Sequence, residues 1–277
     1  MIIQHNITSM NANRQLGIVG NNLSKATEKL ASGYRVNRAA DDAAGLAISE
    51  KMRAQVRGLN RASDNAQDGI SLIQTAEGAM DQQHAILQRA RELVVQASNS
   101  GVLDGGEGAS DKVNEDDFVK IQDELNELSK EFTRIKEQTE FNKKTLLDGT
   151  YEEQYLQVGA NEGQGIKVTI AAVDWALTDM GHDGETNSAG ITEVDNMIKA
   201  LTTERSKLGA IQNRLEYTVK VDDNTAENLQ SAESRIRDTD MADEMTRFSK
   251  ESILQQAATS MLAQANQANQ GVLSLLQ

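Results

Sequence analysis

The fold is decided by the last stretch of the chain, which reads Ser252-Ile-Leu-Gln-Gln-Ala-Ala-Thr-Ser-Met-Leu-Ala-Gln-Ala-Asn-Gln-Ala-Asn-Gln-Gly-Val-Leu-Ser-Leu-Leu-Gln277. It contains no charged residue, although Asp, Glu, Lys and Arg make up 25% of the protein. One set of apolar residues recurs every seven residues, and a second set follows four residues after each member of the first. This spacing predicts a helix with an apolar stripe. Because an isolated helix is marginally stable in water, this segment needs partners on more than one side. The stripe consists of Leu254, Met261, Ala268 and Leu275, followed by Ala258, Ala265 and Val272.

Amide side chains cover the other faces of this helix. In the hydrocarbon of a membrane these amides would need hydrogen-bond partners, so we do not expect a membrane span. Two interpretations remain, namely a helix that packs between copies of the chain and a helix buried in a large globular core. The amides belong to Gln255, Gln256, Gln264, Asn266, Gln267, Asn269 and Gln270.

The composition favours long helices over a compact globule. The 277 residues include no proline, where average usage would give about fourteen, and only 3% are aromatic. The absence of cysteine excludes disulfides, thiol nucleophiles and most structural zinc sites. A net charge of −14 argues against binding nucleic acid or anionic membranes, because phosphate groups require clustered cations. No basic region followed by an apolar run opens the chain, so export would not use an ordinary secretion signal.

Helical spacing of apolar residues predicts four further helices, over about 12–30, 43–98, 116–140 and 191–236. Gly33 is expected to end the first, and Asp41 and Asp42 to cap the second. The first helix has its apolar residues at Ala12, Leu16, Val19, Leu23, Ala26 and Leu30. The second has an unbroken seven-residue series of Met52, Leu59, Ala66, Ile73, Met80, Leu87 and Val94. The last has a similar series of Val194, Leu201, Leu208, Leu215, Leu229 and Ile236, interrupted only by Asp222.

The hydrophobic period changes to two between about 150 and 172. This alternation, divided by Gly159–Gly165, predicts one β-hairpin. We expect Trp175 to be a packing residue and Gly181–Gly190 to be a short polar crossover. The alternating apolar residues are Leu156 and Val158 in one strand, and Ile166, Val168 and Ile170 in the other.

The predicted fold class is therefore mainly α, an elongated antiparallel helical bundle or coiled coil with one small β-hairpin. Both ends of the chain are low in charge, so the N- and C-terminal helices should pair. Residues 1–42 and 240–277 are expected to form a terminal coiled-coil domain. Residues 43–239 are expected to form a rod domain of long helices and the hairpin.

The residues show no arrangement typical of an enzyme or a cofactor site. His5, His84 and His182 lack a second ligand at helical spacing, so no metal site is expected. No Gly-x-Ser-x-Gly elbow occurs, and the glycine clusters lack the context of a phosphate-binding loop. We therefore expect no catalytic activity and no cofactor.

Six segments carry a resemblance to a known family, the bacterial flagellins. The first segment is similar to their N-terminal core, the second to their hairpin and the last four to their C-terminal core. The resemblance covers about 1–100, 118–172 and 190–277. The segments are Leu30-Ala-Ser-Gly-Tyr-Arg-Val-Asn-Arg-Ala-Ala-Asp-Asp-Ala-Ala-Gly-Leu-Ala-Ile-Ser49, Leu156-Gln-Val-Gly-Ala-Asn161, Ser234-Arg-Ile-Arg-Asp-Thr-Asp240, Ile253-Leu-Gln-Gln-Ala257, Met261-Leu-Ala-Gln-Ala-Asn-Gln267 and Val272-Leu-Ser-Leu-Leu276.

The resemblance implies a subunit that is exported and polymerises into the extracellular flagellar filament for motility. In that family the terminal helices line an inner tube, and variable outer domains occupy the middle of the chain. Only Thr178–Ser188 stands in that place here, which implies a minimal flagellin without an outer domain. The implied partners are other copies of the chain, the flagellar export chaperone, the filament cap and the hook-associated proteins.

The resemblance also implies three groups of site residues. Self-assembly is assigned to Leu16, Leu23, Leu30, Leu254, Met261, Val272 and Leu275. Chaperone binding is assigned to Leu254, Met261, Leu262, Leu273 and Leu276. Recognition of the monomer by the host Toll-like receptor 5 is assigned to Arg89, Leu93 and Glu124, which match the family's motif in Gln88-Arg-Ala-Arg-Glu-Leu-Val-Val-Gln96 and Gln122-Asp-Glu124.

Two departures from the family pattern concern these sites. Asn269 stands where flagellins usually have a proline, so the terminal helix is expected to continue further. The loop Asn99–Asp117 is about ten residues longer than usual, which bears on how Arg89 and Glu124 are displayed. The alternative functions are a hook–filament junction protein and, in a different class, an enzyme or host-directed effector exported by the same route.

Overall fold

The computed structural model describes residues 6–99, 115–177 and 184–275; at 115–117, 184–187 and 268–275 it describes the backbone alone. The structure is mainly helical, as predicted. Contacts divide the chain into two compact units, residues 1–56 with 227–277 and residues 57–226. The division falls within two long helices, α2 (Ala43–Ala97) and α5 (Gly184–Arg237). The boundaries of the predicted terminal and rod domains remain predictions.

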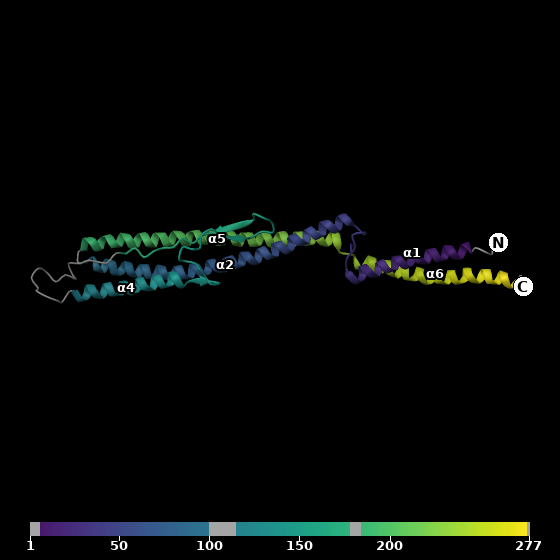
Figure 1. Cartoon of the computed structure of the whole chain (residues 1–277), viewed down its shortest axis with the longest axis horizontal. Coiled ribbons are helices and arrows are strands. Elements are labelled where there is room, and N and C mark those ends of the chain that lie inside the picture. Colours follow the sequence, from purple (N-terminus) through teal and green to yellow (C-terminus); the bar gives the residue numbers. More distant parts are fainter. Residues whose placement is uncertain (1–5, 100–114, 178–183, 276–277) are drawn as a thin grey trace, which may run out of the picture. The chain divides into compact units, whose positions relative to one another are not determined.

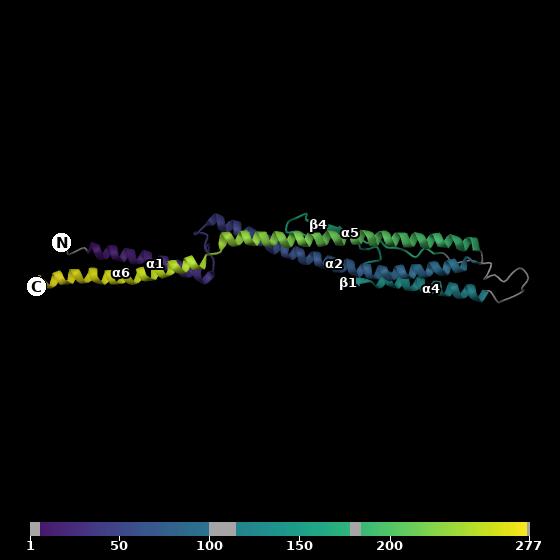
Figure 2. The same ribbon diagram turned by 180° about the vertical axis from the view of Figure 1, so that it is seen from behind.

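In the first unit the N- and C-terminal helices pair with each other, as predicted. Helix α1 (Ile7–Ser32) lies beside α6 (Met241–Leu275) (Figure 1 and Figure 2). Near one end the Asn6 amide donates to the Ala265 carbonyl at 3.0 Å, and near the other the Thr239 N–H donates to Gly33 at 3.0 Å. The two helices are therefore antiparallel.

Local residue chemistry sets the ends of α1. The Asn6 carboxamide accepts the N–H of Ser9, which satisfies one of the free donors at the helix N-terminus. Gly33 follows the last turn with φ of 73° and donates its N–H to Lys29, so it ends the helix as predicted. A left-handed conformation of this kind is accessible to glycine at little steric cost.

The connections beyond α1 and before α6 are tied together in the same unit. Tyr34 and Asp238 form an antiparallel bridge, and the Arg35 guanidinium donates to the Ile236 carbonyl at 2.6 Å. Arg237 lies over the ring of Tyr34, 4.7 Å from its centroid, and pairs with Glu50. These contacts fix the two chain segments side by side where α1 ends and α6 begins.

Helix α2 begins at Ala43, directly after Asp41 and Asp42, as predicted. Asp42 caps it by accepting the N–H of Gly45 at 2.8 Å, while Asp41 accepts N–H groups of the preceding turn from Asn37 and Arg38. Asp42 is therefore the cap of α2, as predicted, whereas Asp41 stabilises the turn before the helix and does not cap it.

In the second unit α2 is flanked by two antiparallel helices, α4 (Glu115–Gln138) and α5 (Figure 1). Arg91 pairs with Asp195 of α5 at 2.7 Å, and Ser63 donates to Asp223 at 2.9 Å. Residue numbers therefore rise along α2 as they fall along α5. The predicted seven-residue series supplies much of the core, in which Ile73, Met80, Leu87, Val94, Val194, Leu201, Leu208 and Leu215 are almost completely buried.

The described residues contain two β-hairpins, so the prediction of one was incomplete. Strands β3 (Gln154–Gln157) and β4 (Gly165–Val168) form the predicted hairpin, with Leu156 opposite Ile166. Strands β1 (Glu140–Phe141) and β2 (Lys144–Thr145) form a smaller one. Each of its strands has two residues, too few to show a period of two.

One loop prediction was wrong over part of its length. Residues 184–190 belong to α5, whereas the sequence predicted a polar crossover; residues 181–183 lie outside the described ranges. Glycine within a helix costs only about 1 kcal/mol relative to alanine, so a Gly-rich polar stretch can extend a long helix. Trp175 is a packing residue as predicted, because its ring lies 5.7 Å from that of the buried Phe132.

Candidate assembly and recognition surfaces

Helix α6 carries one face toward α1 and a second apolar face that the other described residues leave exposed. The buried and half-buried residues of this helix recur at alternating intervals of four and three, which is the seam of a coiled coil. Leu254 and Met261 lie beside this seam and are 41% and 62% exposed, and Ile253 is 67% exposed. The seam residues are Glu244, Phe248, Glu251, Gln255, Ala258, Leu262 and Ala265.

The structure thus divides the residues predicted for self-assembly into two groups. Leu16, Leu23 and Leu30 of α1 are half-buried on the stripe that faces α6, whereas Leu254 and Met261 face outward. Backbone at Val272 and Leu275 continues α6, and their side chains lie outside the description. The exposed Ile7, Met10 and Ile253 were not predicted, because they do not fall on the seven-residue stripe.

The residues predicted for chaperone binding are divided in the same way. Leu262 is half-buried in the seam with α1, while Leu254 and Met261 are accessible without separating the two helices. The side chain of Leu273 and all of Leu276 lie outside the described residues. A partner that covers the accessible pair can therefore bind while α1 and α6 stay paired.

Of the residues predicted for receptor recognition, the structure brings Arg89 and Glu124 together. The Arg89 guanidinium donates from Nε to Glu124 Oε1 at 2.8 Å and from Nη1 to Glu92 Oε2 at 3.1 Å. Its Nη2 also lies 2.8 Å from Glu124 Oε1, which completes the ion pair. These hydrogen bonds, first that with Glu124, raise the pKa of Arg89 above its usual value. Leu93 is 2% exposed and belongs to the core, where it holds α2 in place.

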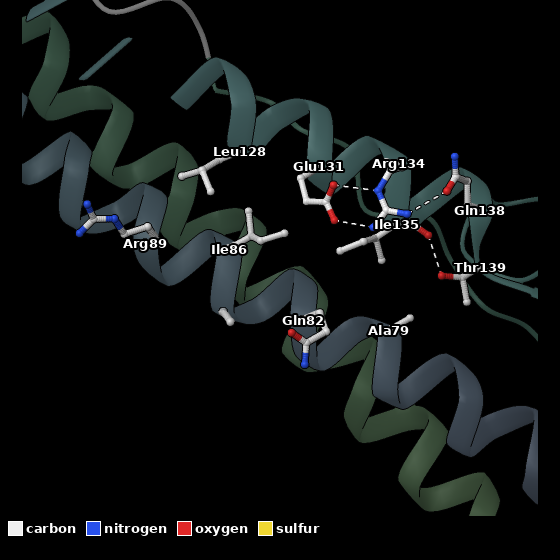
Figure 3. A pocket seen from close by; sticks show the side chains of 11 residues that line it. Ala79, Gln82, Ile86, Arg89, Leu128, Glu131, Arg134, Ile135, Gln138 and Thr139 are labelled. Carbon is white, nitrogen blue, oxygen red and sulfur yellow. Dashed lines mark hydrogen bonds and ion pairs between the residues drawn. The ribbon is translucent and has the colours of Figure 1, made fainter. Parts of the chain in front are cut away.

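A groove with an apolar floor runs between α2 and α4 in the second unit. Its volume is about 750 Å³, and Ile86, Leu128 and Ile135 point into it from the two helices (Figure 3). Arg89 lies at one end, and the Glu131–Arg134 ion pair lies on the α4 side. Sequence reasoning missed this groove, because each helix shows only its own apolar stripe and the gap depends on how the two pack.

Two classes of site are absent from the part of the chain that is described. Over these residues no group of three His, Asp or Glu side chains is placed to hold a metal ion. Among the same residues no helix has the length and mean hydropathy that crossing a bilayer requires.

Long antiparallel helices with an uncovered apolar face on the terminal pair define a structural, self-associating class of protein. Two family models identify it further: the bacterial flagellin N-terminal helical region matches residues 3–152, and the C-terminal helical region matches residues 191–276. The chain therefore belongs to the bacterial flagellin family, whose members are structural proteins.

Relatives match over the whole chain. A flagellin of Halalkalibacterium halodurans is 54% identical, and one of Bacillus subtilis is 46% identical, each alignment covering 100% of both chains. A crystal structure of Bacillus cereus flagellin aligns at 27% identity and a TM-score of 0.46, covering 57% of this chain and 88% of that one. The chain is a structural subunit that polymerises into the flagellar filament, and it lacks a large variable domain between its two flagellin regions.

Proposed function

We propose that the uncovered apolar face of α6, formed by Leu254 and Met261, is the surface through which the terminal pair packs against other copies in the filament. The observation that carries this proposal is its place beside a seam already filled by α1. Complete burial of a fully exposed Leu or Met side chain gains about 1.5–3 kcal/mol, and Leu254 and Met261, which are 41% and 62% exposed, can gain part of that on assembly. The sequence continues the same face through Ala268 and Leu275.

A charge on this face tests the proposal. Met261→Asp leaves the seam with α1 untouched, so the monomer should keep the helical circular dichroism of the wild type. Seeded filament growth should be lost, because a carboxylate buried between copies would lack a partner. Gln256→Asp is the matched control on an exposed polar position of α6 and should polymerise. Growth of Met261→Asp filaments at the wild-type critical concentration would contradict the proposal.

The same face supports a second contact before assembly. The chain is exported through the flagellar secretion route to the extracellular filament, and the export chaperone covers Leu254 and Met261 until then. Leu262 joins this surface only if the seam with α1 opens. At the growing end the cap and the hook-associated proteins are further partners. The full-length flagellin relatives favour the filament role over a hook–filament junction role. Binding of the chaperone to the monomer tests the shared surface: Met261→Asp should lose it, and Gln256→Asp should keep it.

Recognition of the monomer by Toll-like receptor 5 is assigned to the exposed Arg89–Glu124 pair. Both side chains are about half exposed and come from adjacent antiparallel helices, so they present one fixed arrangement of charge. Leu93 contributes only by packing α2, since its side chain is buried. Signalling by purified monomer in a receptor reporter assay tests the pair.

A further inference from the structure

A second exposed apolar stripe lies on α5, far in sequence from the terminal helices. Tyr217 and Val221 are 69% and 61% exposed, and they share a surface hollow of about 470 Å³ with Ala210 and Arg214. The four positions are three or four residues apart, so they form one face of the helix. The buried residues of the same stretch, Leu208 and Leu215, face the core. Within the described part of the second unit these apolar side chains lie outside the core, and the Nζ of Lys220 lies 5.5 Å from the centroid of the Tyr217 ring.

The α2–α4 groove is chemically suited to that stripe. Its floor of Ile86, Leu128 and Ile135 is apolar, and its volume of about 750 Å³ exceeds what a tyrosine and a valine side chain fill. The amide of Gln82 lies at its rim, where it can bond the Tyr217 hydroxyl, since a buried tyrosine O–H requires a partner. Figure 3 shows Ile86 of α2 and Leu128 and Ile135 of α4 lying between the two helices.

The net charges of the two surfaces also favour contact between the α5 stripe and the α2–α4 groove. Over its described side chains, residues 118–138, helix α4 carries five acidic and four basic residues, a net charge of −1. Residues 199–221 of α5 carry five Lys or Arg and two Glu, a net charge of +3. Copies of a chain with a net charge of −14 repel one another unless their contacts set opposite charges together. Placing this part of α5 against α4 does so.

Assembly into a helical filament requires contacts of this kind. Open helical assemblies are built from heterologous contacts, in which one surface of a subunit binds a different surface of the next. We propose that the α5 stripe of Ala210, Arg214, Tyr217 and Val221 of one copy docks in the α2–α4 groove of a neighbouring copy. The inference rests on the filament function and adds a contact distinct from the α6 face.

Cross-linking locates the contact directly, because the chain has no cysteine of its own. Copies with Ala210→Cys and copies with Gln82→Cys, carrying different tags, are assembled together on seeds and treated with a short bismaleimide. Mixed dimers should form in filaments and not in monomers. Thr202→Cys, on another exposed face of α5, is the control and should give at least tenfold fewer mixed dimers with Gln82→Cys.

A substitution measures the energetic weight of the same contact. Tyr217→Asp should leave the melting temperature of the monomer unchanged and raise the critical concentration for seeded growth at least tenfold. Tyr155→Asp, at the half-exposed tyrosine of β3, should polymerise as the wild type. Filaments that give no Ala210–Gln82 dimers, or Tyr217→Asp filaments with the wild-type critical concentration, would overturn the docking. Either result leaves the filament function standing, whereas loss of growth in Met261→Asp alone concerns the α6 face.

Discussion

The two compact units differ in how completely each buries its own apolar side chains. In the second unit Ile73, Leu87, Phe132 and Leu208 are buried almost completely between helices of the same chain. In the first, α1 and α6 share a single seam whose members are mostly half-buried, and Met10 and Met261 remain more than 60% exposed. A pair of helices can bury only one face of each. The terminal unit is therefore built to be completed by other copies, while the second unit folds around its own core.

The largest difference should appear when a leucine is truncated in each unit. Leu87→Ala removes a completely buried side chain, which should lower the free energy of unfolding by about 2–5 kcal/mol. Leu23→Ala, in the half-buried seam of α1, should cost less than half as much in the monomer and should impair filament growth more. Urea denaturation of both monomers, followed by seeded growth, makes the comparison. Equal losses of monomer stability would show that the terminal seam is as well packed as the core.

A second prediction concerns the single break in the core series of α5. Asp222 is 7% exposed, and its Oδ2 finds no hydrogen-bond partner among the described residues. Burial, reinforced by the charge of Asp223, raises the pKa of Asp222. Because the folded-state pKa is the higher one, this residue costs no stability below the usual aspartate pKa. The free energy of unfolding then falls as the pH rises through the raised value.

Asp222→Leu should remove this loss and continue the apolar seam. The variant should be about 1–3 kcal/mol more stable than the wild type at neutral pH, the usual cost of a buried unsatisfied polar group. The gain should vanish in acid. Thermal melts between pH 3 and pH 7 measure it, with the exposed Asp68→Asn as a control that keeps the wild-type profile. A variant whose advantage persists unchanged at pH 3 would assign the effect to packing alone.

The residues that the sequence located well are those whose role depends on a period. The seven-residue series in α2 and α5 predicted the core, and the low charge of both ends predicted the pairing of α1 with α6. Asp42 and Gly33 marked helix ends because their chemistry is local. What the sequence could not show were the short β1–β2 hairpin, the α2–α4 groove and the exposure of Leu254. Each depends on which face of a helix or loop another segment covers.

A third prediction compares two glycines with open space around them. Gly33 has a positive φ, so Gly33→Ala should destabilise the first unit by about 1–2 kcal/mol through backbone strain alone. Gly78 lies within α2 in ordinary helical conformation, so Gly78→Ala should stabilise by about 0.5–1 kcal/mol. Hydrogen exchange of each unit measures the two effects separately. Opposite signs are expected, and a stabilising Gly33→Ala would contradict the assigned helix end.

The smallest effect on stability should come from Arg89, although it carries a proposed recognition role. Its ion pair with Glu124 is about half exposed, and solvent-exposed ion pairs contribute little to the free energy of unfolding. Arg89→Glu should therefore leave the monomer folded with nearly unchanged stability. It should nevertheless weaken activation of a Toll-like receptor 5 reporter, because the charge presented to the receptor is reversed. Arg134→Glu, at an equally exposed ion pair of α4, controls for a general change of charge.

Exchanging Arg89 and Glu124 distinguishes the effect of the ion pair on stability from the effect of each charge on receptor binding. The double variant Arg89→Glu with Glu124→Arg can re-form the ion pair and should recover any stability lost in Arg89→Glu. Receptor activation should stay weak if the receptor reads the position of each charge, and should recover if the pair matters only for holding α2 and α4 together. Undiminished signalling by Arg89→Glu would remove Arg89 from the site.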